Sequence, residues 1–239
     1  MSTPSKASGP PPEADRGIVL PIFPLPDLVL FPNVRVPLHI FEPRYRELTA
    51  DVLAGDRRFA IAVIEAGFEH EALGTPPIRS LVGTGVIDTS HELPDGRFLL
   101  SLRGEGRGRI ERELEREGRP YRRALIRLEP PDRPPVALLP VAAELRKLVG
   151  RLCALAVLDS GLAPLAAEAP ATESPMKALA LVHALAYASP LTVDVKLRLL
   201  AIDDPVTRAV TLRAELGRLE VREEVMARHR PAGDDFRVN

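Results

Sequence analysis

The chain has 239 residues, of which 45% are hydrophobic and 27% are charged, so it is long enough to bury a core as one large or two small domains. Its 32 lysines and arginines nearly balance 33 aspartates and glutamates, and the net charge of -1 argues against a strong electrostatic field for nucleic acid or an anionic membrane. The single cysteine, Cys153, cannot form an internal disulfide, which fits a reducing cytoplasm. No apolar core follows the one lysine near the N-terminus, so no signal peptide is visible and we expect a cytoplasmic protein without a membrane segment.

The first 17 residues form a tail that contains no aromatic or branched apolar residue after Met1, which predicts disorder over residues 1–17. Ordered structure is expected to begin at Ile18. From Pro21 to Pro43 prolines recur every few residues. Because proline cannot donate a hydrogen bond to a neighbouring strand, the sequence predicts turns and edge strands in this stretch and no central strand.

One helix and two strands are predicted after Ile40. Four apolar residues are spaced for one face of a helix over residues 42–54: Phe41, Tyr45, Leu48 and Val52. The runs 59–64 and 78–88 are compatible with strands, and a turn is expected at residues 94–96.

Charged residues alternate with glycines at 104, 106 and 108 in the segment 103–111. This pattern predicts a strand that turns its charges to water and lets another backbone approach its glycine face closely. A further strand is expected at 121–128. Because so many short strands need their edges covered, residues 18–129 are predicted to form a β-rich module with one helix, closed or nearly closed into a barrel.

After the proline-rich segment 130–135 the apolar residues follow a helical spacing. They predict a helix with a buried stripe from residue 138 to residue 156. Ser-Pro and Asp-Pro steps at residues 174 and 204 mark the starts of two more helices, with a short helix at 193–201 between them. On the last helix four apolar side chains are expected to share one face: Leu212, Leu216, Leu219 and Met226. The predicted fold class is therefore α+β, with a helical bundle over 136–228 and a C-terminal tail over 229–239.

Residues with catalytic or metal-binding chemistry do not form a recognisable set. The five histidines are scattered, and one cysteine adds too few ligands for a structural zinc site. The three glycines of the alternating strand are followed neither by the lysine of a phosphate loop nor by a helix, and no nucleophile–base pair is evident. We therefore expect no catalytic residue, no cofactor and no metal, and we expect His39 and His183 to pack against apolar neighbours.

The segment 97–127 holds ten arginines and five glutamates, a local excess of +5. Such an excess can contact RNA or an acidic partner. The regular interleaving of the two signs favours a solvated strand face with Arg–Glu pairs, and RNA binding is kept as the alternative.

The stretch from Leu20 to Tyr45, LPIFPLPDLVLFPNVRVPLHIFEPRY, strongly resembles the opening of the N-terminal, substrate-binding domain of Lon proteases. The chain is similar to bacterial stand-alone proteins that contain only this domain. Later segments agree in their order along the chain: VGTGVI at 82–87 with PDGR at 94–97, GRGRI at 106–110, and KLRLLAIDDPVTR at 196–208. The resemblance implies a β-barrel-like module related to the PUA superfamily, followed by a helical bundle.

For function, the resemblance implies a non-enzymatic module that binds unfolded or exposed polypeptide, since we find neither a Walker loop nor a protease serine motif in this sequence. A protease or chaperone is a further expected partner, and nucleic acid is not. RNA binding through the PUA-like barrel and its arginine-rich strands is the alternative. The expected polypeptide-binding residues lie where loops meet the first helix: Phe31, Arg35, His39 and Arg44.

Overall fold

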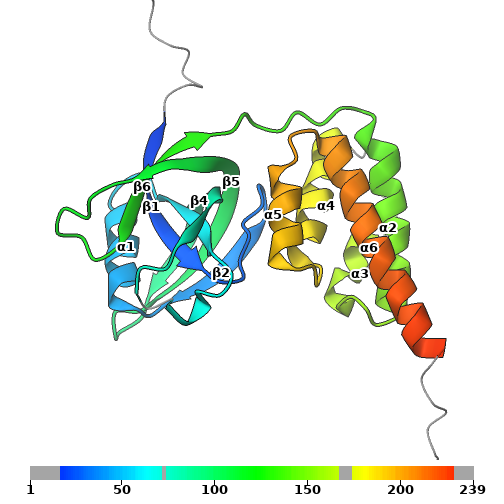
Figure 1. The fold of residues 1–239 in the computed structure, drawn as a ribbon, viewed down its shortest axis with the longest axis horizontal. Helices are drawn as coiled ribbons and strands as arrows, with labels where there is room; N and C mark the ends of the chain where they lie inside the picture. The colour runs from blue at the N-terminus through cyan, green and yellow to red at the C-terminus, as the bar shows by residue number, and fades with distance from the viewer. Residues whose placement is uncertain (1–16, 72–73, 167–173, 229–239) are drawn as a thin grey trace, which may run out of the picture. The chain divides into compact units, whose positions relative to one another are not determined.

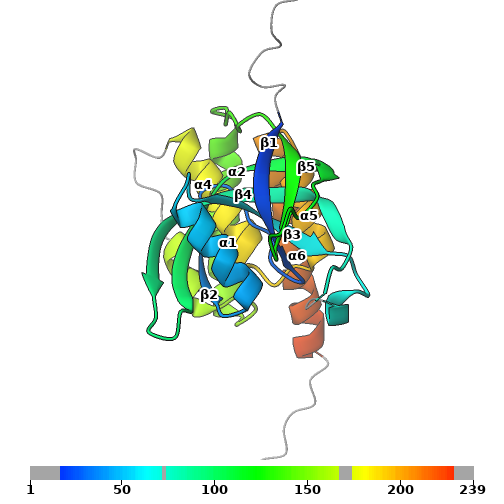
Figure 2. The same ribbon diagram turned by 90° about the vertical axis from the view of Figure 1, so that its left-hand side faces the viewer.

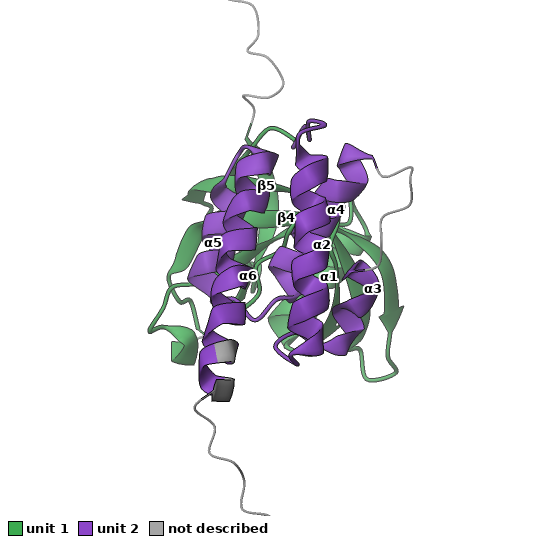
Figure 3. Cartoon of the chain, turned by 90° about the vertical axis from the view of Figure 1, so that its right-hand side faces the viewer, with its two compact units in different colours: residues 1–131 green, residues 132–239 purple. Residues whose placement is uncertain are grey.

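The structure is a computed structural model that describes residues 17–71, 74–166 and 174–228. The chain divides into two compact units, Met1–Pro131 and Asp132–Asn239 (Figure 3). The tails predicted at the two ends lie outside the described residues, except for Gly17. Within the described ranges, no helix is both long enough and apolar enough to cross a membrane.

The first unit contains strands and one α-helix (Figure 1). Its elements, in chain order, are β1 (Ile18–Leu25), β2 (Arg35–Ile40), α1 (Pro43–Leu53), β3 (Arg58–Ile64), β4 (Ile78–Glu92), β5 (Phe98–Glu113) and β6 (Arg122–Leu128), with a short 3-10 turn at Glu69–Glu71.

These strands close into a barrel, and one strand is added at the edge. The order is β2-β5-β4-β3-β1-β6, and β6 also pairs with the C-terminal half of β5, so five strands form a ring. The N-terminal half of β5 pairs instead with β2. Figure 2 shows α1 in front of the strands. The predicted α+β fold, with a closed β module that carries one helix, is confirmed.

Strand β1 corrects the expectation that the proline-rich stretch holds only turns and edge strands, because β1 lies between β3 and β6 in the sheet. It pairs with β6 over residues 18–22 and with β3 over residues 22–25. Pro21 and Pro24 therefore each lie where β1 has a neighbour on one side. A strand with one neighbour can turn the missing N–H of a proline to the unpaired side, which makes both prolines compatible with the ladder.

Gly104 and Gly108 of β5 are each approached closely by another backbone, as predicted, but they lie on opposite faces of the strand and do not form one glycine face. A Cβ atom at Gly104 would lie 2.1 Å from the carbonyl oxygen of Phe31, and one at Gly108 would lie 2.7 Å from the carbonyl oxygen of Arg127. The expectation that every charge of β5 faces water is wrong for Arg107, which is buried. The register shifts by one residue beside Gly104, where Glu105 is the extra residue, and this bulge reverses the side to which the following residues point.

The barrel interior is filled by small and branched side chains: Leu20, Ile22, Ala60, Ala62, Val82, Ala124 and Ile126. Helix α1 covers a second apolar layer, in which the rings of Phe23 and Tyr45 lie 4.2 Å apart between centroids. Its buried residues include Leu48 and Val52, as the helical spacing predicted. Phe41 precedes the helix and is exposed, so its expected place on the buried helix face is wrong.

The second unit consists of helices in the described residues: α2 (Leu138–Ala154), α3 (Ala163–Ala166), α4 (Pro175–Ala188), α5 (Val193–Ala201) and α6 (Pro205–Arg228), with a 3-10 turn at Ser160–Leu162. The two longest, α2 and α6, run side by side (Figure 1 and Figure 3). Ser174 and Asp204 accept hydrogen bonds from the backbone N–H groups of Lys177 and Thr207, so both cap helices as the sequence predicted. Met226 is exposed and not part of the buried face expected for the last helix.

A charged cluster lies in the middle of the helical unit. Arg208 of α6 is fully buried and donates to both carboxylate oxygens of Asp132, at 2.6 and 3.0 Å. Its guanidinium also bonds the backbone carbonyls of Leu199 and Ile202, and lies 2.6 Å from Nε2 of His183. His183 is buried as predicted, but in this polar contact rather than among apolar neighbours alone.

Candidate functional site

A row of exposed side chains crosses three strands on the outer face of the sheet. His39 of β2 lies opposite Leu99 of β5, and Leu99 in turn lies opposite His91 of β4. All three side chains are exposed, with 46% of Leu99 accessible. His39 is therefore not packed in the core as the sequence suggested. We call His39, Phe41, His91 and Leu99 together the β2–β5–β4 face.

Phe41 extends this row beyond the end of β2. Its side chain is 59% exposed, and its ring centroid lies 5.8 Å from that of His39. Glu42, in an extended conformation, and Pro43 at the first helical turn begin α1 directly after Phe41, which leaves the phenyl ring outside the helix. Two large apolar side chains, Phe41 and Leu99, therefore flank a histidine on a surface open to water.

The free edge of β2 borders this face. The N–H of Gly104 donates to the carbonyl of Val34 at 2.9 Å, so even-numbered residues along β2 direct their backbone groups to β5. Backbone groups of successive residues in a strand point to opposite edges. The N–H and C=O groups of Arg35 and His39, and the C=O of Pro37, therefore point away from β5. Among the described residues the sheet ends at β2. Proline on an edge strand limits uncontrolled strand pairing, yet donors remain on both sides of Pro37.

The opposite end of the face carries an ion cluster. Nε of Arg35 and Nε of Arg103 donate to the two carboxylate oxygens of Asp88, at 2.8 and 3.0 Å. These hydrogen bonds, that from Arg35 first, hold the pKa of Asp88 below its usual value, so the carboxylate stays ionised. Asp88 is the extra residue where the β4–β5 register shifts, which lets it reach both arginines. Arg103 also lies 3.9 Å from a carboxylate oxygen of Glu105, so the cluster that borders this row contains charges of both signs.

Of the four residues expected from the sequence, the structure brings Arg35 and His39 to this face. Phe31 is fully buried, and its carbonyl instead packs against Gly104. Arg44 lies in α1, where it donates to Glu42 and to the backbone carbonyl of Gly74 at 2.8 Å. The binding role of the four residues stays a prediction, and we leave Phe31 out of the surface because it has no exposed atoms to offer.

Most of the arginine-rich segment 97–127 is paired with acids. Seven of its arginines lie within 4.0 Å of a carboxylate oxygen: Arg97, Arg103, Arg109, Arg119, Arg122, Arg123 and Arg127. Paired arginines present little net charge to a polyanion. The exposed pairs match the solvated, interleaved face that the sequence favoured, whereas Arg107 and Arg122 of this segment are buried. In the described parts of the chain no three His, Cys, Asp or Glu side chains are grouped so that they could hold a metal ion.

Comparison with known proteins identifies the domain type. The family described as the ATP-dependent protease La (LON) substrate-binding domain matches residues 19–216. A Lon protease of Dictyoglomus thermophilum is 31% identical over 109 residues, which are 45% of this chain and 13% of that protease. A Lon protease of Azospirillum brasilense is 29% identical over 106 residues, which are also 13% of its length. The matched region is thus a small part of these relatives.

Solved structures agree with the fold. The Lon N-terminal domain protein from Xanthomonas campestris superposes with a TM-score of 0.58 at 24% identity, covering 82% of this chain and 98% of that one. The N-terminal domain of the Mycobacterium avium complex Lon protease gives a TM-score of 0.60 at 18% identity, covering 84% and 98%. At these identities the superpositions establish the fold.

Proposed function

The chain belongs to the Lon substrate-binding domain family, and from this premise we propose that it binds exposed, extended polypeptide on the β2–β5–β4 face. The observation that carries the proposal is the pair of exposed apolar side chains, Phe41 and Leu99, beside the free edge of β2. An unfolded segment offers apolar side chains that can cover Phe41 and Leu99, and a backbone that can pair with the edge strand β2.

The exposed areas predict a modest affinity. Complete burial of a Phe or Leu side chain contributes about 1.5–3 kcal/mol, and both residues already have about half of their surface covered, so each adds about 1 kcal/mol on binding. Backbone hydrogen bonds to Arg35 and His39 add to this term and do not depend on the sequence of the peptide. We expect weak binding that tolerates many sequences, which suits a module that selects unfolded segments.

We further propose that the protein has no catalytic step of its own and passes the bound segment to a protease or chaperone partner. Purified protein is then expected neither to hydrolyse ATP nor to cleave casein. We do not propose RNA binding as a second function. The arginines of these strands are paired with acidic side chains, so they offer little positive charge to a phosphate backbone.

Fluorescence anisotropy with a permanently unfolded protein, such as reduced and carboxymethylated α-lactalbumin, tests this proposal. The double variant Phe41→Ser/Leu99→Ser should weaken binding by about tenfold or more, the equivalent of about 1.4 kcal/mol. The matched control is Val221→Ser/Met226→Ser on α6, which removes two side chains that are each 60% exposed. Equal binding by wild type and the double variant, or an equal loss in the control, would contradict the proposal.

A further inference from the structure

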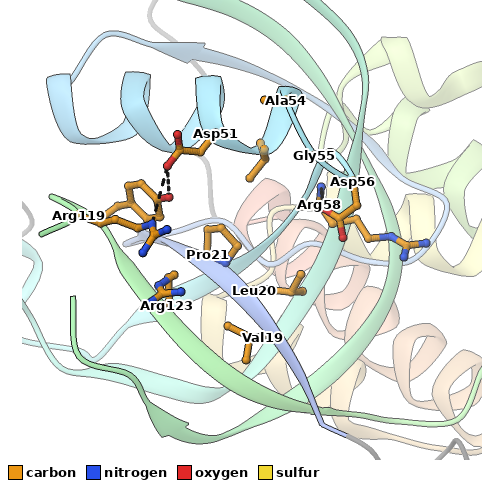
Figure 4. Close-up of a pocket in the computed structure, with 12 residues that line it drawn as sticks. Val19, Leu20, Pro21, Asp51, Ala54, Gly55, Asp56, Arg58, Arg119 and Arg123 are labelled. Carbon is orange, nitrogen blue, oxygen red and sulfur yellow. Dashed lines mark hydrogen bonds and ion pairs between the residues drawn. The ribbon is translucent and has the colours of Figure 1, made fainter. Parts of the chain in front are cut away.

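A separate hollow of about 400 Å³ lies in the first unit (Figure 4). We call it the β1–α1 hollow, and it is lined by residues 19–21 of β1, the end of α1 and the loop to β3, and four side chains: Arg58, Arg119, Tyr121 and Arg123. It opens on the side of β1 where residues 18–21 have no β3 neighbour, because the β1–β3 ladder begins at Ile22. The hollow is large enough for a small organic group.

The hollow is lined by both positively charged and apolar side chains. Figure 4 shows Arg119 and Arg123 on one side of Pro21 and Arg58 on the other. Val19, which is half exposed, and Pro21 supply an apolar wall between these arginines. A ligand that fits must therefore combine an anionic group with an apolar body.

The donors on the Arg119–Arg123 side are only partly used. Nη2 of Arg123 donates to Glu117 at 2.6 Å, while its Nε is buried and has no hydrogen-bond partner in the described part of the chain. Nη1 of Arg119 lies 3.5 Å from the same carboxylate, and its Nε lies 4.0 Å from Asp51. Both guanidinium groups thus face one shared carboxylate, that of Glu117, and their N–H donors can hold another carboxylate in its place.

Glu117 is held weakly. Its side chain is 65% exposed, and it lies in a turn where both Glu117 and Gly118 have positive φ angles. The Arg123 side chain is mostly covered, but the Glu117 side of the pair is open to water, so an incoming carboxylate can displace that of Glu117. Glu117 thereby marks where an anionic group sits between Arg119 and Arg123.

The charge of the lining selects the kind of anion. Once Glu117 is displaced, the three arginines and two aspartates of the lining, Asp51 and Asp56, leave a net charge of +1. The Tyr121 hydroxyl donates to Asp51, and burial followed by this hydrogen bond raises the pKa of Tyr121 to about 12, so the phenol adds no negative charge near neutral pH. A monoanion balances this lining, whereas a phosphate dianion or a polyphosphate would face an excess of negative charge. The planar guanidinium fork also matches a carboxylate.

We infer that the β1–α1 hollow binds an organic monocarboxylate with an apolar body, held by Arg119 and Arg123 in place of Glu117 and packed against Val19 and Pro21. Two sources offer this chemistry: a free small carboxylic acid, or the C-terminal residue of a polypeptide with an apolar side chain. The site is distinct from the β2–β5–β4 face and does not depend on polypeptide binding there.

Calorimetric titration with 4-methylpentanoate, and with its neutral amide as the control, tests the inference. The acid should bind and the amide should not. Arg123→Gln should weaken binding of the acid about tenfold or more, the range of a charge-assisted hydrogen bond, whereas Glu117→Gln should strengthen it about two- to fivefold by removing the competing carboxylate. Arg97→Gln, which removes an exposed arginine paired with Asp95, should change nothing.

A tetrapeptide ending in leucine, with a free or an amidated C-terminus, separates the two sources. Binding of 4-methylpentanoate without the free-acid peptide assigns the hollow to small acids, and binding of the free-acid peptide that depends on Arg123 assigns it to chain ends. Equal binding of acid and amide, no binding of either carboxylate probe, or weaker binding in Glu117→Gln overturns the inference. If Arg123→Gln loses the chemical-shift dispersion of the folded protein, Arg119→Gln replaces it. Binding of unfolded protein at the other face should be unchanged in all these variants, so the two proposals fail independently.

Discussion

Replacing Arg208 by Met should destabilise the helical unit more than any surface change. The guanidinium is fully buried and bonds Asp132, His183 and two backbone carbonyls. The methionine side chain fills much of the same volume but donates no hydrogen bond. Removing one partner of a buried ion pair costs about 3–5 kcal/mol, because the other charge stays buried without it. The side chain of Asp132 is only 8% exposed, so water cannot replace the guanidinium fully.

Urea unfolding followed by far-ultraviolet circular dichroism measures this loss. We expect a free energy of unfolding about 3–5 kcal/mol lower in Arg208→Met, which is a large part of the total stability of a typical domain. The control Arg218→Met removes an arginine that is 71% exposed and paired with Glu215, and should cost about 0–1 kcal/mol.

A second variant tests the physical reason. If an uncompensated buried carboxylate causes the loss, then adding Asp132→Leu to Arg208→Met should restore part of the stability, because both charges are then absent. A loss below about 1 kcal/mol in Arg208→Met would refute the reasoning, as would a double variant whose loss equals the sum of the two single losses.

Three further predictions concern other parts of the fold. Gly104→Ala should cost about 1–3 kcal/mol in urea unfolding, since its methyl group would lie 2.1 Å from the Phe31 carbonyl, whereas Gly106→Ala, with nothing nearer than 3.5 Å, should cost much less. Asp204→Ala should cost about 0.5–2 kcal/mol at neutral pH. Hydrogen bonds from Thr207 lower the pKa of Asp204, so this difference should be present above the ordinary value of 3.8 and shrink as the pH falls below it. The raised pKa of Tyr121 predicts a contribution that is complete below pH 10 and is lost as the pH rises to about 12, so the stability of Tyr121→Phe should fall less steeply over that window; parallel curves would contradict this.

The helices could be predicted from the sequence because their signals are local. Ser174 and Asp204 cap helices through bonds to residues three positions later, and the buried stripe of α2 follows from spacing alone. The path of β1 could not be predicted in this way. Its prolines are tolerated because its two neighbours pair with different halves of the strand, and that arrangement depends on residues about 40 and 100 positions further along the chain.

Only some residues of the candidate face could be predicted from the sequence. Arg35 and His39 lie in the stretch that resembles the family opening, so sequence reasoning reached them. His91 and Leu99 join them through strand register, and Leu99 stands between buried Phe98 and Leu100 in an apolar run without alternation. Phe41 fits the spacing of the α1 face but precedes the helix by two residues. Register and helix starts of this kind are settled by tertiary packing rather than by local pattern.

Amide hydrogen exchange at the edge of β2 tests the central claim most directly. The backbone N–H groups of Arg35 and His39 point away from β5, so they should exchange fast in the free protein. With a saturating, permanently unfolded protein present, both amides should slow by about tenfold or more as the added strand accepts their hydrogen bonds, while the amides of α6 keep their rates. Unchanged exchange at Arg35 and His39 in a sample where the unfolded protein is demonstrably bound would contradict polypeptide binding at this face.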